Sequence, residues 1–144
     1  MQTIAQMVAS EGREWTGNPP ATAEEIAALR QELPFELPLE YVEFLEVCNG
    51  GEGELALPPL WFQLYDTKFA IELRRNRDYR LNFPDLFFFG SNGGLESIAI
   101  DMRAKGQWPI VMVDCIAGMS SAKQISANLR QFIEAVGVRS HHVA

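Results

Sequence analysis

Residues 37–51 read LPLEYVEFLEVCNGG and carry the clearest helix signal in the chain. Four apolar side chains follow the i, i+3, i+4, i+7 spacing of one helix face, namely Tyr41, Phe44, Leu45 and Cys48. Pro38 suits the first turn, where its missing N–H costs no hydrogen bond. The Asn-Gly-Gly run at 49–51 is a strong stop, because glycine adopts the left-handed conformation that ends many helices. This stretch therefore predicts a helix that buries one face and ends sharply.

Two more helices are expected on the N-terminal side of this stretch. Residues 2–15 can form the first, and the run Gly17–Pro20 breaks it. Thr22 opens the second, since Thr22 and Glu25 have the spacing of a capping box. Pro34 ends that helix, because the residue before a proline avoids the helical conformation.

The chain becomes strand-rich on the C-terminal side. Residues 55–57 and 60–65 are expected to be short strands, and 67–80 to be partly helical, with Phe69 and Leu73 facing inward. Further strands are expected at 86–89, 95–102 and 108–113, with a hairpin turn at 90–94 where Asn-Gly favours a tight turn. A last helix is expected at 121–136, followed by a loose tail from Gly137 to residue 144.

This order of elements predicts the fold class. Helices come first, then strands with one helical insertion, then a helix, which favours an α+β fold over a regular βαβ alternation. We expect a central, largely antiparallel sheet flanked by N-terminal and C-terminal helices. The length of 144 residues is typical of a single domain, taken as 1–144.

Composition excludes several classes of function. Nineteen acidic against twelve basic residues give a net charge of −7, which disfavours nucleic-acid binding because phosphates require a basic surface. No apolar stretch approaches the roughly 20 residues that span a bilayer, and the N-terminus lacks the basic and apolar regions of a signal peptide. We therefore expect a cytoplasmic protein that does not contact a membrane.

Candidate chemistry is sparse, so we expect no catalytic residues, no metal site and no cofactor. The histidines, His141 and His142, are adjacent near the C-terminus, and there is no C-x-x-C or H-x-x-x-H spacing. A strand rather than a helix follows the glycine-rich turn at 90–94, which disfavours a phosphate loop. Cys48 and Cys115 have apolar neighbours and are expected to be structural. The alternative to this expectation is that the protein is a small hydrolase whose carboxylates at the strand ends hold Mg²⁺.

Charge is distributed unevenly along the chain. Residues 24–54 contain nine acidic residues against Arg30 alone, whereas residues 68–80 contain five basic residues against two acidic ones. Solvated helix faces explain such runs, and so does an acidic surface that recognises a basic partner. Trp61 and Phe62 alternate on a strand, so one of them can face outward beside the acids and serve as an interface hot spot.

The order of these signals resembles the SUKH superfamily, in its Smi/Knr-like branch. The Leu-Pro…Tyr…Phe-Leu…Asn-Gly-Gly pattern at 37–51 and the Phe-Gly…Gly-Gly turn at 89–94 are similar to its two hallmark regions, and the resemblance covers about 22–136. It implies an α+β fold and a non-enzymatic binding role. Bacterial members are commonly immunity proteins that neutralise a polymorphic toxin, often a nuclease, and eukaryotic members are regulatory binding proteins. The hallmark glycines look architectural.

Together these observations predict an immunity-type protein that occludes a basic toxin domain. A regulatory protein-interaction module without a toxin partner is the alternative, and the oligomeric state stays open. The residues expected to contact the partner are Glu52, Glu54, Trp61, Tyr65, Asp66, Glu96 and Asp101.

Overall fold

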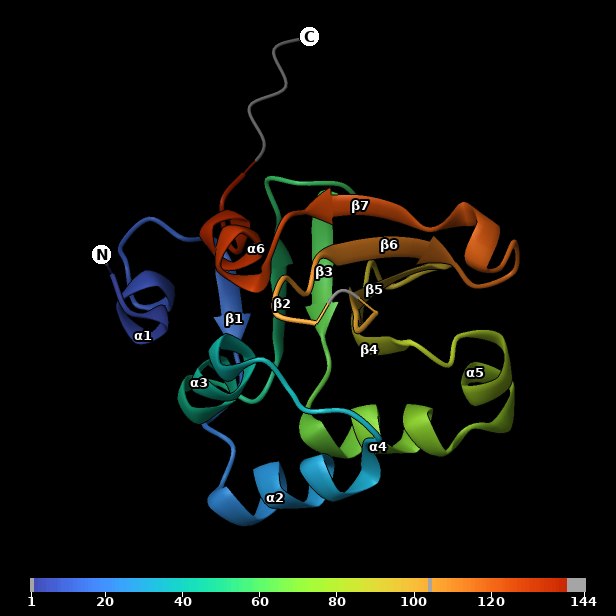
Figure 1. Cartoon of the computed structure of the whole chain (residues 1–144). Coiled ribbons are helices and arrows are strands. Elements are labelled where there is room, and N and C mark those ends of the chain that lie inside the picture. Colours follow the sequence, from blue (N-terminus) through green and yellow to red (C-terminus); the bar gives the residue numbers. More distant parts are fainter. Residues whose placement is uncertain (1, 104, 140–144) are drawn as a thin grey trace, which may run out of the picture.

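The computed structural model describes residues 2–103 and 105–139 (Figure 1). Within these ranges seven strands form one antiparallel sheet, and each strand pairs with the next along the chain. The strands are β1 (Trp15–Gly17), β2 (Gly51–Glu54), β3 (Trp61–Leu64), β4 (Leu86–Ser91), β5 (Glu96–Asp101), β6 (Ile110–Asp114) and β7 (Lys123–Ser126). The helices are α1 (Ile4–Val8), α2 (Ala23–Glu32), α3 (Leu39–Val47), α4 (Thr67–Arg75), α5 (Arg77–Asn82), the 3₁₀ helix η1 (Met119–Ser121) and α6 (Leu129–Ala135). The predicted α+β class with a flanked antiparallel sheet is confirmed.

The two faces of the sheet are buried to different extents. One face packs against α1, α3 and α6 in the main core, to which β4 contributes Phe87 and Phe89. The opposite face is covered over β4–β6 by α5 and by the connection from β6 to β7, around Phe83 and Phe88. Among the described residues none forms such a cover over β1–β3, where alternate side chains such as Glu52 are exposed. The outward face of β1–β3 is therefore an open surface.

The Asn-Gly-Gly turn at 49–51 ends α3 and contacts the segment that leads from β3 into α4. Gly50 has φ +86°, and a Cβ added there would collide with the carbonyl oxygen of Leu64. The buried side chain of Asn49 accepts a hydrogen bond from the backbone N–H of Thr67 at 2.9 Å. Both contacts position the chain that leads from β3 into α4.

The expected helix over 2–15 is wrong beyond its first turns. Only Ile4–Val8 is helical, and Trp15–Gly17 is the edge strand β1. Trp15 of this strand lies opposite Gly53 of β2, whose missing side chain leaves room for the Cα and Cβ atoms of Trp15. The strand expected at 55–57 lies earlier, at Gly51–Glu54.

The C-terminal expectations also need correction. The region 121–136 is not one helix but contains β7 and the shorter helix α6, which Asn128 caps by accepting a hydrogen bond from Gln131 N at 2.8 Å. Gly137 is not loose, because its N–H donates to the carbonyl of Glu54 at 2.7 Å and its carbonyl accepts from Glu14 N at 2.5 Å. The rest of the predicted tail, 140–144, lies outside the described residues.

Candidate functional site

A groove of about 370 Å³ lies on the open face of the sheet, between β1–β3 and the first turn of α4. Its lining consists of Thr16, Asn18, Gly51, Glu52, Gln63, Leu64, Tyr65, Asp66 and Phe69. Two carboxylates, two amides and two aromatic rings thus share the groove, and none of its lining residues is a lysine or an arginine. Such a lining offers hydrogen-bond acceptors and aromatic surface to a positively charged group.

The strand register produces the acidic part of the groove. Glu52 lies opposite both Thr16 of β1 and Gln63 of β3, so the three side chains form one row on the outward face. Gln63 Nε2 donates to Glu52 Oε2 at 3.3 Å. This bond holds the Glu52 carboxylate in the row while leaving the side chain exposed to a partner.

The start of α4 produces the aromatic part. Asp66 is the N-cap residue, and its Oδ1 accepts a hydrogen bond from Phe69 N at 2.8 Å. This cap places the Phe69 ring edge-on against Tyr65, with ring centroids 4.6 Å apart. Burial raises the pKa of the Tyr65 hydroxyl above its ordinary value, so the ring stays neutral at physiological pH. Phe69 is 43% exposed, which corrects the expectation that it faces inward.

Three of the seven predicted contact residues, Glu52, Tyr65 and Asp66, line this groove. Trp61 lies on the same outward face of β3 and is 42% exposed, while its neighbour Phe62 is fully buried, as the alternation predicts. Glu54 pairs with Trp61 across β2 and β3, but it is half-buried, with a carboxylate oxygen 3.7 Å from the guanidinium of Arg139.

The other two predicted residues lie on β5. Glu96 begins this strand, and its carboxylate accepts a hydrogen bond from Asn92 Nδ2 at 3.4 Å. Asp101 ends the strand, is buried, and binds Arg103 through two side-chain contacts of 2.8 and 3.0 Å. Hydrogen bonding to the Arg103 guanidinium lowers the pKa of Asp101 below its ordinary value. The structure therefore separates Asp101 from the groove and pairs it internally.

Sequence reasoning missed six of the nine lining residues, among them Thr16, Gln63 and Phe69. Thr16 belongs to the strand β1, for which the sequence instead predicted a helix ending at Trp15 and a break beginning at Gly17. Gln63 could have been found, since it follows the exposed Trp61 at the strand period of two. The exposure of Phe69 could have been suspected from Asp66 three residues earlier, because that spacing is typical of an N-cap and the first turn of a helix.

In residues 2–103 and 105–139 no group of three or more His, Cys, Asp and Glu side chains is arranged to hold a metal ion. None of the helices in this described part is both long and apolar enough to cross a membrane.

A comparison with models of known families shows to which family this chain is similar. The model of the SMI1 / KNR4 family (SUKH-1) matches residues 20–135. The chain belongs to this family. The match includes the turn at 49–51 and the part of the groove formed by β2, β3 and α4, whereas Thr16 and Asn18 precede it. A comparison with curated proteins gave no match. Membership in SUKH-1 is compatible with an immunity-type, protein-binding role.

Proposed function

We propose that this SUKH-1 protein is an immunity protein that binds a cognate polymorphic toxin through the groove and occludes it. The observation that carries the proposal is the lining, which combines the carboxylates of Glu52 and Asp66 with the half-buried ring of Tyr65 and the exposed ring of Phe69 and contains no basic side chain. A basic toxin surface fits this combination in both charge and chemistry.

The aromatic pair would supply most of the affinity. Interface energy is concentrated in a few large side chains, and aromatic residues are prominent among them. Phe69 has 43% of its surface left to bury, and its contact with Tyr65 holds it in place before binding. A rigid anchor loses little conformational entropy when the partner covers it. Trp61, on the same face of the sheet, extends this apolar surface.

The carboxylates would supply encounter rate and selectivity. Complementary charge raises association rates and rejects wrong partners more than it adds net affinity. The nucleic-acid-binding surface of a nuclease is positively charged because it binds phosphates. An acidic groove on a chain with net charge −7 would therefore be attracted to it. Inhibition would follow from steric occlusion of that site, with no catalytic step, metal or cofactor on the side of the immunity protein.

The experiment begins with identification of the partner. The full chain is used as bait in a lysate of its native host, and the captured proteins are identified by mass spectrometry at several salt concentrations. A single stoichiometric partner with a basic domain supports the proposal. Several weak, substoichiometric partners would contradict it and favour a regulatory interaction module.

Association kinetics with the captured partner then test the groove. Glu52→Lys should slow association by about tenfold at low salt and flatten its salt dependence. Glu46→Lys is the matched control, because it makes the same charge change on an exposed position of α3 outside the groove. Phe69→Ala should weaken binding by about 2 kcal/mol, mainly through faster dissociation. Equal rates for the Glu52 and Glu46 variants would refute the placement of the site.

A further inference from the structure

The basic segment at 68–80 takes almost no part in the groove and forms a second hollow. This hollow, of about 510 Å³, lies where the C-terminal ends of α2 and α4 meet α5. The two helices α2 and α4 lie side by side below the sheet (Figure 1). The lining consists of Gln31, Glu32, Leu33, Pro34, Arg74, Arg75 and Arg80.

The charges of this hollow do not balance. Three arginines and one glutamate line it, which leaves a formal charge of +2. Arg75 forms an ion pair with Glu32. Neither Arg74 nor Arg80 forms an ion pair with a carboxylate within the described residues. Two guanidinium groups therefore share one hollow without an anion in a protein that is acidic overall.

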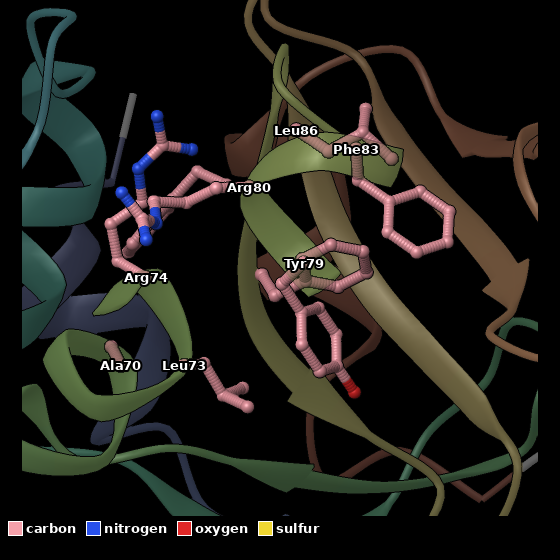
Figure 2. A pocket seen from close by; sticks show the side chains of 9 residues that line it. Ala70, Leu73, Arg74, Tyr79, Arg80, Phe83 and Leu86 are labelled. Atoms are coloured by element: carbon pink, nitrogen blue, oxygen red, sulfur yellow. The ribbon is translucent and has the colours of Figure 1, made fainter. Parts of the chain in front are cut away.

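The two unpaired guanidinium groups are close enough to affect each other. Figure 2 shows the side chains of Arg74 and Arg80 extending to the same side of α4 and α5. Burial, and after it the positive charge of Arg80, lowers the pKa of Arg74 below its ordinary value, with Asp85 opposing the effect. Because both side chains are at least partly exposed, water and Asp85 offset part of this repulsion, and an anion bound between the two groups would offset more of it.

The surrounding side chains hold both arginines in place. The Arg74 guanidinium lies over the ring of Phe35, 5.4 Å from its centroid. Beneath the hollow, Arg74 and Arg80 pack with Tyr79 and Phe83 around a void of about 10 Å³, which has room for one water molecule at most (Figure 2). Arg74 and Arg80 therefore line both the hollow and the packed region beside it.

Helix electrostatics explain part of this arrangement. All three arginines lie in the last turn of their helices, where a cation offsets the negative end of the helix dipole. The dipole accounts for the presence of arginine at each helix end. It does not explain why α4 and α5 direct their arginines into one hollow without a carboxylate for Arg74 and Arg80.

We propose that this hollow binds the phosphate group of a small phosphorylated molecule, held between Arg74 and Arg80. A phosphate monoester carries close to two negative charges at neutral pH and matches the +2 lining, whereas a single carboxylate would leave one guanidinium without a partner. The guanidinium fork binds phosphate oxygens in pairs, which makes arginine well suited to this group. The volume of about 510 Å³ is within the range of small-molecule sites and exceeds the space that phosphate alone requires.

The test titrates the full chain with adenosine monophosphate and pyrophosphate, with sodium chloride and acetate at matched ionic strength as controls. Arginine Nε–Hε NMR signals of residues 74 and 80 should shift in a saturable manner with the phosphate compounds and remain unchanged with chloride and acetate. Arg80→Gln should weaken binding at least about tenfold, because it removes a charge-assisted hydrogen-bond donor. Arg80→Lys, which keeps the charge without the fork, should lose less.

Arg77→Gln is the matched control. Arg77 begins α5, is exposed, and does not line the hollow, so its loss should leave phosphate affinity within about twofold of the unaltered chain. The proposal is overturned if no phosphate compound saturates the signals. Equal losses from the variants at 77 and 80, or equal shifts with acetate, would overturn it as well. None of these readouts involves the groove or its partner, so the proposal stands or falls separately from the immunity function.

Discussion

Replacing Asn49 by alanine should destabilise the protein through a single buried hydrogen bond. The Asn49 side chain is 9% exposed, and its Oδ1 accepts from the buried backbone N–H of Thr67 at 2.9 Å. Asn49→Ala leaves that N–H without a partner, which costs about 1–3 kcal/mol. With about 3 °C of melting-temperature change per kcal/mol for a chain of this size, we expect a loss of about 6 °C.

Thermal unfolding followed by circular dichroism measures this loss, and hydrogen exchange locates it. The Thr67 amide should exchange faster in the variant. Thr67 is the first residue of α4, so its N–H has no acceptor within the helix once the Asn49 side chain is removed. Asn18→Ala is the control, because Asn18 lies in an exposed loop and donates only one side-chain bond, to the Asn49 carbonyl at 2.9 Å. It should cost no more than about 1 kcal/mol. A melting temperature of Asn49→Ala equal to that of the unaltered chain, with Thr67 still protected, would refute the reasoning.

Three further changes have defined signs. Tyr41→Phe should raise the melting temperature, since the buried Tyr41 hydroxyl has no hydrogen-bond partner in the described residues; a lower value would contradict this. By the same measurement, Gly50→Ala should cost more than Gly118→Ala; both have φ +86°, but only at Gly50 would a Cβ meet backbone atoms. Asp101→Asn should cost about 1 kcal/mol at neutral pH in urea titrations. The Asp101–Arg103 pair stabilises the fold above the ordinary aspartate pKa of 3.8 and is lost as the pH falls below it, so the difference should vanish in acid.

The part of the fold that local signals encode was predictable. The helix before the Asn-Gly-Gly stop was expected from Pro38 onward and is found at Leu39–Val47. The capping box at Thr22 begins α2 as predicted, with both reciprocal hydrogen bonds present. The strands around the turn at 90–94 were also identified, because alternation and Asn-Gly chemistry act over a few neighbouring residues.

The elements that were missed depend on distant contacts. A three-residue strand such as Trp15–Gly17 has too few residues to show a period, and it pairs with β2, where Trp15 lies opposite Gly53. In β7, Ile125 continues the apolar spacing of the following helix by coincidence, so strand and helix were joined into one prediction. The Asn128 cap was the available signal that α6 begins later.

The candidate site was predictable only in part for the same reason. Composition indicated acids beside aromatics, and Glu52, Tyr65 and Asp66 do meet in one groove. Register decides which side chains share a row, and it places Glu52 of β2 beside Thr16 of β1 and Gln63 of β3. A list of charged residues in sequence order contains no such information.

Inhibition of the captured partner tests the central proposal most directly. The partner's activity is titrated with the unaltered chain, with Glu46→Lys, and with a variant carrying both Glu52→Lys and Phe69→Ala. The account predicts stoichiometric loss of activity with the first two and a requirement for about 100-fold more of the double variant. Full inhibition by a stoichiometric amount of the double variant would contradict the placement of the site, and tight binding of the unaltered chain without loss of activity would contradict the immunity function itself.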